Sequence, residues 1–269
     1  RRVIVANSVG RRYDNVDILC IGQKGQERYE HQNNIAYYRL PPYIRTDGPG
    51  GAHDRFPKQM LQYSTYILAS FIKLVSLSIH KKYDVIHVHN PPDFIILAAI
   101  PFKLLLGTKI ILDLHDMLPE VLTSHLNLPD NHLFAKSAKI VEKYAIRYSD
   151  AVICTNEYDK EIVLSRNSID PDKIFVVMNS PDLNLCMSEK STKDQFGLGG
   201  KFVLLFEGTI WNRRGIQTII ESICTLKDKV PLTLLVVGDG PDLEDLKNLS
   251  SRLGVSDYVK ITQDKINLF

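Results

Sequence analysis

Two segments in the last third of the chain have residue types and spacing suited to binding a diphosphate. The first reads FVLLFEGTIWNRRG from Phe202 to Gly215, and the second reads LTLLVVGDGP from Leu232 to Pro241. Each apolar run ends at a glycine before a helical pattern, which predicts a strand, a tight turn and a helix N-terminus. Unpaired backbone N–H groups and the helix dipole attract anions at such a turn.

Two adjacent arginines favour the first of these turns as the anion site. Guanidinium groups bind phosphate oxygens through two parallel hydrogen bonds. The second turn is followed by three acidic residues directly after Pro241, which suit a helix dipole but repel a bare phosphate. The alternative is an ordinary α/β domain with surface arginines. We expect the diphosphate at Arg213, Arg214 and Gly215, beside a wall formed by Gly238, Asp239 and Gly240.

Polar residues also follow predicted strands in the first part of the chain. Ligands of open α/β sheets collect beyond the carboxyl ends of the strands, so these positions are candidates for chemistry. His115 could donate a hydrogen bond between a sugar and its phosphate, or it could be a capping or core histidine. Asp116 could equally be a helix N-cap. The other polar residues in such positions are Asn90, Glu120, Asn156 and Glu157.

Several other kinds of site are disfavoured by the sequence. His87 and His89 face the same side of a strand, but no nearby Cys or carboxylate offers a convincing third ligand, so packing is favoured over a metal. The chain has no G-x-S-x-G motif and no Walker loop. The pair Gly238 and Gly240 lacks the third glycine of a dinucleotide fingerprint. We therefore expect no metal site, and a dehydrogenase is a weak candidate.

The elements that must position these residues follow from an alternation of short apolar runs with longer helical patterns. Runs that are apolar on both faces are typical of parallel strands covered by helices. The predicted strands are Val16 to Ile21, Asp84 to His89, Lys109 to Leu114, Ala151 to Thr155, Ile174 to Val177, Phe202 to Phe206, Leu232 to Val237 and Tyr258 to Ile261. The predicted helices are Asp54 to Lys82, Asp93 to Leu106, Leu133 to Tyr148, Tyr158 to Asn167, Arg214 to Lys227 and Pro241 to Leu253. The fold class is α/β with doubly wound parallel sheets.

A stretch of turn-forming residues from Asn179 to Gly200 divides the chain. We expect an N-terminal domain over residues 1–182, a linker over 183–200 and a partial C-terminal domain over 201–269. The glycine-rich segment from Tyr43 to Asp54 is expected to be a mobile loop. The second domain contributes three strands before Phe269, fewer than a complete sheet of this kind has.

Composition excludes disordered and fibrous proteins. The chain has 269 residues, of which 44% are hydrophobic and 24% charged, and its net charge is +2. Residues 1–82 hold thirteen Lys or Arg against six Asp or Glu. This basic third suits an anionic partner such as a phospholipid surface or a lipid pyrophosphate, although a solvated face of scattered arginines explains it as well. No nucleic-acid partner is expected.

The cysteines and apolar segments favour a cytoplasmic protein. The four cysteines lie far apart and form no CxxC motif, so a reducing compartment is the simpler interpretation. The longest apolar run, Phe94 to Leu106, is too short to span a bilayer. The apolar segment from Tyr66 to Ile79 ends in His80, Lys81 and Lys82, which suggests a peripheral location at the inner membrane face.

Taken in order, these motifs resemble the retaining glycosyltransferases of family 4, which have the GT-B architecture of two Rossmann-like domains. The resemblance covers nearly the whole chain. It is carried by DVIHVHN from Asp84, LDLHDMLPE from Leu112, SDAVICTNE from Ser149, KIFVVMNSPD from Lys173, the turn from Glu207 to Gly215, and LVVGDGP from Leu235.

The resemblance implies roles for the candidate residues. The N-terminal domain would take the acceptor, and the C-terminal domain would bind a nucleotide-diphosphate sugar, with retention and without a metal or other cofactor. His115 corresponds to the family histidine that contacts the donor sugar, and Asp116 follows it as expected. Arg214 takes the usual lysine position, in a turn that includes Gly208 and Gly215. Thr209 stands where many members have arginine, so Arg213 would substitute.

The activity implied is transfer of a hexose or N-acetylhexosamine to a glycan or lipid-linked acceptor in cell-surface polysaccharide synthesis. Asn90, Glu120, Asn156 and Glu157 would lie on the acceptor side. Two family elements are expected to be missing: the first strand with its glycine loop, before Arg1, and an E-x7-E pair, after Phe269. We therefore expect a fragment that is inactive by itself. The alternatives are a non-catalytic binding module and a GT-B epimerase, for which Glu120 and Glu157 are unconvincing acid–base groups.

Overall fold

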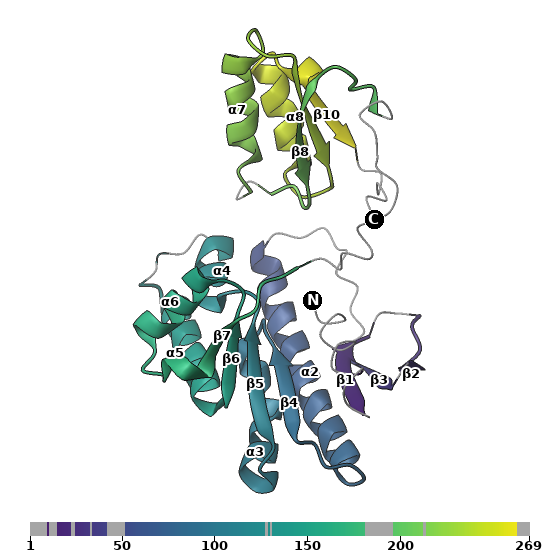
Figure 1. Cartoon of the computed structure of the whole chain (residues 1–269), viewed down its shortest axis with the longest axis vertical. Coiled ribbons are helices and arrows are strands. Elements are labelled where there is room, and N and C mark those ends of the chain that lie inside the picture. The colour runs from purple at the N-terminus through teal and green to yellow at the C-terminus, as the bar shows by residue number, and fades with distance from the viewer. Residues whose placement is uncertain are drawn as a thin grey trace. The chain divides into compact units, whose positions relative to one another are not determined.

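The computed structural model describes residues 10, 15–22, 25–32, 34–41, 52–126, 129, 131–180, 196–211 and 214–262. The chain divides into two compact units, Arg1–Ser180 and Pro181–Phe269 (Figure 1). Both units have α/β architecture with parallel strands, as the alternation of apolar runs and helical patterns predicts. Of the predicted loop from Tyr43 to Asp54, only Ala52 to Asp54 lie in the described part, and these residues are helical. Residues 181–195 of the predicted boundary region lie outside it.

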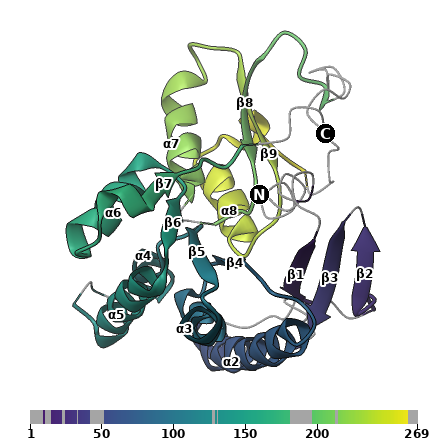
Figure 2. The ribbon, with the colours of Figure 1, turned by 60° about the horizontal axis from the view of Figure 1, so that its bottom comes forward.

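Unit 1 is built on a four-stranded parallel sheet in the order β4-β5-β6-β7. The strands are β4 (Val85–His89), β5 (Lys109–Leu114), β6 (Ala151–Cys154) and β7 (Ile174–Val176). The connecting helices are η1 (Asp93–Ala98), α3 (Ile100–Leu106), α4 (Leu118–Leu126), α5 (Leu133–Tyr148), α6 (Glu157–Arg166) and η2 (Pro171–Lys173). Figure 2 shows α2 (Ala52–Ser78), α3 and α5 on the same side of this sheet.

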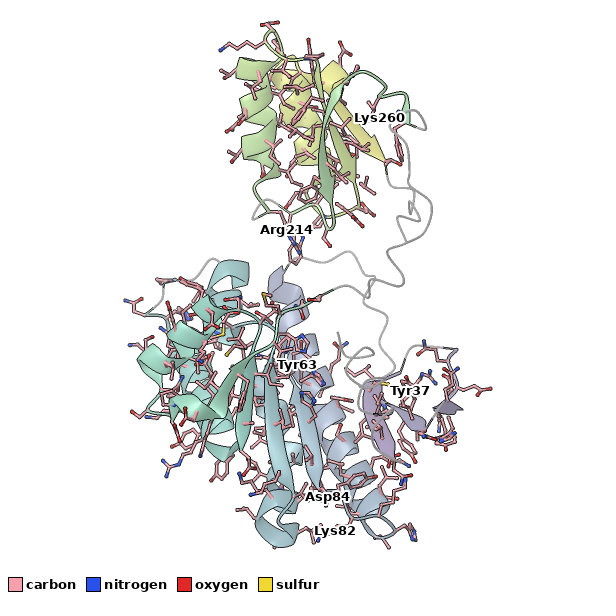
Figure 3. The ribbon with its side chains drawn as sticks, viewed as in Figure 1. Tyr37, Tyr63, Lys82, Asp84, Arg214 and Lys260 are labelled. Atoms are coloured by element: carbon pink, nitrogen blue, oxygen red, sulfur yellow. The ribbon has the colours of Figure 1, made fainter. Side chains whose placement is uncertain are left out.

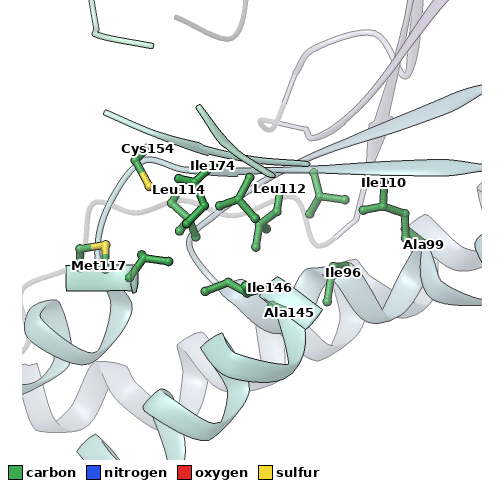
Figure 4. Packing of buried hydrophobic residues seen from close by; sticks show 13 residues of the cluster. Ile96, Ala99, Ile110, Leu112, Leu114, Met117, Ala145, Ile146, Cys154 and Ile174 are labelled. Carbon is green, nitrogen blue, oxygen red and sulfur yellow. The ribbon is translucent and has the colours of Figure 1, made fainter. Parts of the chain in front are cut away.

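The core of unit 1 lies between the sheet and these helices. Ile110, Leu112 and Leu114 alternate along β5 and are at most 2% exposed. They belong to one cluster with Ala145 and Ile146 of α5, which Figure 4 shows packed against the strand. Successive strand residues point to opposite faces, so Asp113 faces away from this cluster. The register pairs His89 of β4 with Asp113, which brings their side chains to one face.

A second, three-stranded sheet precedes α2. It consists of β1 (Val16–Ile21), β2 (Tyr29–Gln32) and β3 (Ile35–Leu40), with β1 parallel and β2 antiparallel to β3. The sequence predicts β1 but neither β2 nor β3. Three of the four residues of β2 are exposed and show no apolar period, and in the more buried β3 Arg39 interrupts the apolar run. Tyr66 of α2 connects the helix to this sheet, because its hydroxyl donates to the carbonyl of Leu19 at 2.8 Å.

Unit 2 has a parallel sheet in the order β10-β9-β8. Its elements are β8 (Phe202–Glu207), α7 (Ile216–Leu226), β9 (Leu232–Val237), α8 (Leu243–Arg252), η5 (Ser256–Tyr258) and β10 (Val259–Thr262). All six residues of β9 are buried. Leu234 and Val236 pack against the helices, and Leu235 and Val237 pack against Phe196 and Leu198. Phe196 and Leu198, which the sequence assigns to a linker, are therefore part of the core of unit 2.

Candidate functional site

The two glycine turns of unit 2 touch each other through their main chains. A Cβ atom on Gly238 would lie 1.9 Å from the carbonyl oxygen of Gly208, and one on Gly240 would lie 2.1 Å from that of Ile210. The amide of Ile210 donates to the carbonyl of Asp239 at 3.0 Å. These glycines are therefore needed for the turns to pack together, which sets Gly238 to Gly240 beside the turn after β8.

Arg214 lies at the carboxyl end of the unit 2 strands (Figure 3). Its main-chain amide donates to the carbonyl of Trp211 at 2.8 Å, and its side chain is exposed. Gly215 follows with a φ of 75° and caps α7, whose first turn holds no acidic residue. The first turn of α8 holds Glu244 and Asp245. Of these two helix N-termini, that of α7 is therefore the more favourable for an anion.

The remaining residues of the predicted diphosphate site are only partly described. Thr209 is exposed and Gly208 has a φ of 136°. Arg213 lies outside the described residues. The diphosphate contacts of this turn stay a prediction.

In unit 1, three histidines surround a buried carboxylate. Asp113 is fully buried, and its Oδ2 atom lies 3.4 Å from His87 Nε2, 3.3 Å from His89 Nδ1 and 3.6 Å from His115 Nε2. Burial by itself would raise the pKa of Asp113, but the imidazole groups of His87, His89 and His115 close to its carboxylate outweigh burial and lower the pKa. Asp113 therefore stays ionised.

Sequence reasoning missed Asp113, although strand alternation was a signal for it. A residue two positions before His115 on a strand shares a face with the pair His87 and His89 if β4 and β5 are neighbours. The ligand atoms of His87, His89 and Asp113 lie within 4.8 Å of one another, so they could hold a cation. The expectation that no nearby carboxylate offers a third ligand is therefore wrong, because Asp113 lies beside both histidines. The expected absence of a metal stays a prediction.

His115 itself lies at the start of the loop after β5, with its side chain 16% exposed. Its Nε2 atom is 2.9 Å from Nδ1 of His89. Asp116 is exposed. These two residues are thus placed at the carboxyl edge of the sheet, where ligands of such sheets bind.

Asn90, which is fully buried, holds the main chain of this loop. Its Oδ1 atom accepts hydrogen bonds from the amides of His115 at 2.5 Å and Asp116 at 3.4 Å. Its Nδ2 group donates to the carbonyl of Asp116 and to Oδ1 of Asp93, both at 2.7 Å. The Asn90 side chain therefore fixes the main chain at His115 from inside the unit. Because Asn90 is fully buried, it offers no surface to an acceptor in this structure.

Asp93, which accepts the hydrogen bond from Asn90, lies in the interior of unit 1. It is fully buried, and burial raises its pKa to about 7 despite the hydrogen bond from Asn90. Asp93 Oδ2 is buried without a hydrogen-bond partner. A carboxyl group in this position is stabilised by carrying a proton.

Of the other three acceptor-side candidates, Glu120 and Asn156 have structural partners. Glu120 pairs with Arg166 at 2.6 Å, and Arg166 also pairs with Glu142, which is 1% exposed. Asn156 caps α6 by accepting from the amide of Asp159 at 2.8 Å. Glu157 is exposed in the first turn of α6. Their contact with an acceptor stays a prediction.

Two α/β units of this kind, with polar side chains at the carboxyl edges of their parallel strands, fit the GT-B architecture. Residues 5–185 match glycosyltransferase family 4, and the chain belongs to this family.

Curated relatives carry glycosyltransferase names. A UDP-Gal:alpha-D-GlcNAc-diphosphoundecaprenol alpha-1,3-galactosyltransferase of Escherichia coli is 28% identical over 206 residues, which is 69% of this chain and 50% of the relative. The N-acetyl-alpha-D-glucosaminyl L-malate synthase of Bacillus anthracis is 25% identical over 206 residues, 74% of this chain and 51% of the relative. The chain thus spans about half the length of these two relatives.

The fold is shared with solved structures. Anabaena HepE in complex with UDP superposes with a TM-score of 0.62 at 17% identity, over 94% of this chain and 71% of that chain. At this identity the likeness shows the fold alone. It bears out the prediction of two Rossmann-like units.

Proposed function

We propose that the protein transfers a hexose or N-acetylhexosamine, with retention of configuration, from a nucleotide-diphosphate sugar to a glycan or lipid-linked acceptor. Family membership supports transfer of a sugar in general. The observation that carries the proposal is the placement of His115 at the carboxyl edge of the unit 1 sheet, held there by buried Asn90.

The chemistry follows from where charge develops. Breaking the bond between sugar and phosphate leaves negative charge on the diphosphate, and fixed positive groups stabilise this charge most as it forms. Arg214, Gly215 and the N-terminus of α7 would supply that stabilisation in unit 2. His115 would donate a hydrogen bond to the donor sugar from unit 1. Arg213 and Thr209 would complete the diphosphate contacts.

Lipid-linked acceptors are favoured by the relatives' names. The Escherichia coli relative is named for a diphosphoundecaprenol acceptor. A mannosyltransferase of Mycolicibacterium smegmatis, named for a phosphatidylinositol monomannoside, is 35% identical over 72 residues, 26% of this chain and 19% of the relative. Both names join a sugar to a lipid, and we extend the proposal to a role in cell-surface polysaccharide synthesis.

A GT-B epimerase is the second candidate. A UDP-N-acetylglucosamine 2-epimerase structure superposes with a TM-score of 0.50 at 12% identity, over 88% of this chain and 56% of that chain, which shows the fold alone. An epimerase needs carboxylates free for acid–base work. Glu120 is held in an ion pair with Arg166, which disfavours it for that task. Epimerised donor in an incubation without acceptor would favour this alternative.

Diphosphate binding at Arg214 can be tested by titration calorimetry with UDP and GDP. The proposal predicts that Arg214→Ala weakens binding of the preferred diphosphate about tenfold or more, because a charged hydrogen bond to phosphate contributes about 1.5–3 kcal/mol. It predicts a smaller effect on the monophosphate. Arg252→Ala, at the far end of α8, is the matched control and should bind like the unchanged chain. Equal binding by the two variants would contradict the assignment.

A further inference from the structure

Helix α2 has apolar residues on two sides. On its inner side Leu74 packs against Ala98 and Phe102. Its outer side, with the turn residue that follows it, carries five aliphatic residues that are 42% to 73% exposed: Leu61, Leu68, Ile72, Val75 and Ile79. Their spacing of seven, four, three and four residues puts them in one stripe along the helix, which we name the outer stripe. A helix that is apolar on all sides is normally buried in a protein core or a membrane.

The polar residues beside the outer stripe are adapted to an apolar surrounding. The hydroxyl of Ser64 donates to the carbonyl of Met60 at 3.0 Å, and that of Thr65 donates to the carbonyl of Leu61 at 2.8 Å. Because these hydroxyls already have partners, removing them from water costs less. Lys73 is the single charged residue between Met60 and Ile79, and its ammonium group lies 4.2 Å from the centre of the Tyr38 ring.

The apolar surface of α2 continues onto η1, and α3 carries further exposed apolar residues. An apolar groove runs between α2 and η1, and Leu68, Phe94 and Leu97 are among its lining residues. Leu97 is 57% exposed, and Leu104 and Leu105 of α3 are 68% and 80% exposed. Contiguous exposed apolar surface of this kind marks an interaction site.

The segment Met60–Ser78 is long and apolar enough to cross a bilayer. Its inner contacts oppose a crossing. The hydroxyl of Tyr66 donates to the carbonyl of Leu19 in β1, and Phe71 packs edge to face on Phe102 of α3 with ring centroids 6.1 Å apart. These contacts keep α2 on the surface of unit 1, so the outer stripe can meet a membrane only by lying along it.

Charge next to the stripe indicates what kind of surface it meets. His80 and Lys82 are exposed directly after α2, and Lys82 is labelled in Figure 3 near exposed Asp84. Lys81 is paired with Asp17 at 2.9 Å. The first 82 residues have more than twice as many basic as acidic residues. An apolar stripe that ends in exposed basic residues, in a part of the chain with a basic excess, is typical of helices that lie in the interface of an anionic membrane.

We propose that the outer stripe of α2, together with Leu97, Leu104 and Leu105, docks unit 1 onto an anionic phospholipid bilayer without crossing it. A second copy of the chain would cover the aliphatic stripe but leave the basic excess without a partner. A lipid surface with acidic headgroups satisfies both. This step rests on the proposed function: docking in this way would bring unit 1 to the membrane surface that carries a lipid-linked acceptor.

Vesicle sedimentation tests the proposal on the full chain. The probe is phosphatidylcholine vesicles with and without phosphatidylglycerol. The chain should sediment with the mixed vesicles and remain largely in solution with phosphatidylcholine alone. The double variant Leu68→Ser/Ile72→Ser should lower the partition coefficient about tenfold or more, since two aliphatic side chains no longer enter the apolar layer. The control Leu133→Ser/Ile140→Ser removes two residues of α5 that are 77% and 56% exposed, and it should bind normally.

Three outcomes would overturn the proposal. The first is equal sedimentation with and without vesicles. The second is an equal loss of binding in both double variants. The third is a lipid-free dimer, detected by light scattering, that the α2 variant alone dissociates, because the stripe would then bind a second copy. Vesicle binding requires no sugar donor, so its result is independent of the proposed transfer activity.

Discussion

Asn90 Oδ1 lies 2.5 Å from the main-chain amide nitrogen of His115. The two residues come from neighbouring strands, since Asn90 follows β4 and His115 follows β5. The buried side-chain amide of Asn90 accepts from main-chain N–H groups of the loop after β5 and donates to a main-chain carbonyl of the same loop. It therefore fixes the main chain of that loop. The position of the His115 ring therefore depends on a side chain that does not reach the surface.

Replacing Asn90 should damage turnover more than nucleotide binding. Asn90→Ala leaves the amides of His115 and Asp116 without their acceptor, which should lower the free energy of unfolding by about 1–3 kcal/mol. In the full product of the gene, the turnover number should fall, whereas the Kd for the nucleotide diphosphate should change little, because that ligand is assigned to unit 2. Asn167→Ala is the control, since Asn167 is also a buried amide and bonds Glu142 at 3.1 Å. An equal loss of turnover in both variants would show that only stability is involved.

The buried carboxyl of Asp93 should make stability depend on pH. Its pKa is about 7 in the folded chain, against 3.8 for an unperturbed carboxyl. Between these values the folded state holds a proton that the unfolded state has released, so stability falls as pH rises, by at most about 1.4 kcal/mol per pH unit. Asp93→Asn removes this contribution. Thermal unfolding of both chains between pH 4 and about 7 should give a flatter profile for the variant, and parallel profiles would contradict the raised pKa.

Gly240→Ala should destabilise unit 2 strongly for a steric reason alone. The added methyl group would lie 2.1 Å from the carbonyl oxygen of Ile210, a main-chain atom that cannot rotate away. The loss should be at least about 3 kcal/mol. Gly254 has open space around it and a φ of 63°, so Gly254→Ala should cost only about 1–2 kcal/mol. Urea unfolding of both variants measures the difference, and similar losses would mean that the turns rearrange.

Arg166→Gln should unfold unit 1 more easily, because it leaves the buried Glu142 without its cation. Losing one partner of a buried pair costs about 3–5 kcal/mol. The more exposed pair of Lys103 and Asp150 is the comparison, and Lys103→Gln should cost about 1 kcal/mol or less. The double variant Arg166→Met/Glu142→Met should recover much of the loss. A failure to recover would assign the effect to packing rather than to charge.

The sequence predicts those elements whose apolar pattern is set by burial. Strand β5 and helix α5 have the predicted bounds, Lys109–Leu114 and Leu133–Tyr148, because each has a continuous apolar face in the core. Strand β2 and helix α4 are not predicted, since β2 is largely exposed and α4 is short and has Pro119 as its second residue.

The candidate site likewise has features that the sequence predicts and features that it does not. His115 and Asn90 could be selected because both follow apolar strands. The bond between them could not, because it depends on β4 and β5 being neighbours in the sheet. The cluster around Asp113 needed the same register, since His87 and His89 are more than twenty residues away along the chain.

Sugar transfer by the full product of the gene that contains this sequence is the most direct test of the proposed function. The product would be incubated with labelled UDP- and GDP-sugars and a lipid-linked acceptor, and the anomeric configuration of the new bond read by NMR. We predict transfer with retention from one donor, reduced at least about 100-fold in His115→Ala. No transfer from any donor, or undiminished transfer by His115→Ala, would contradict the account.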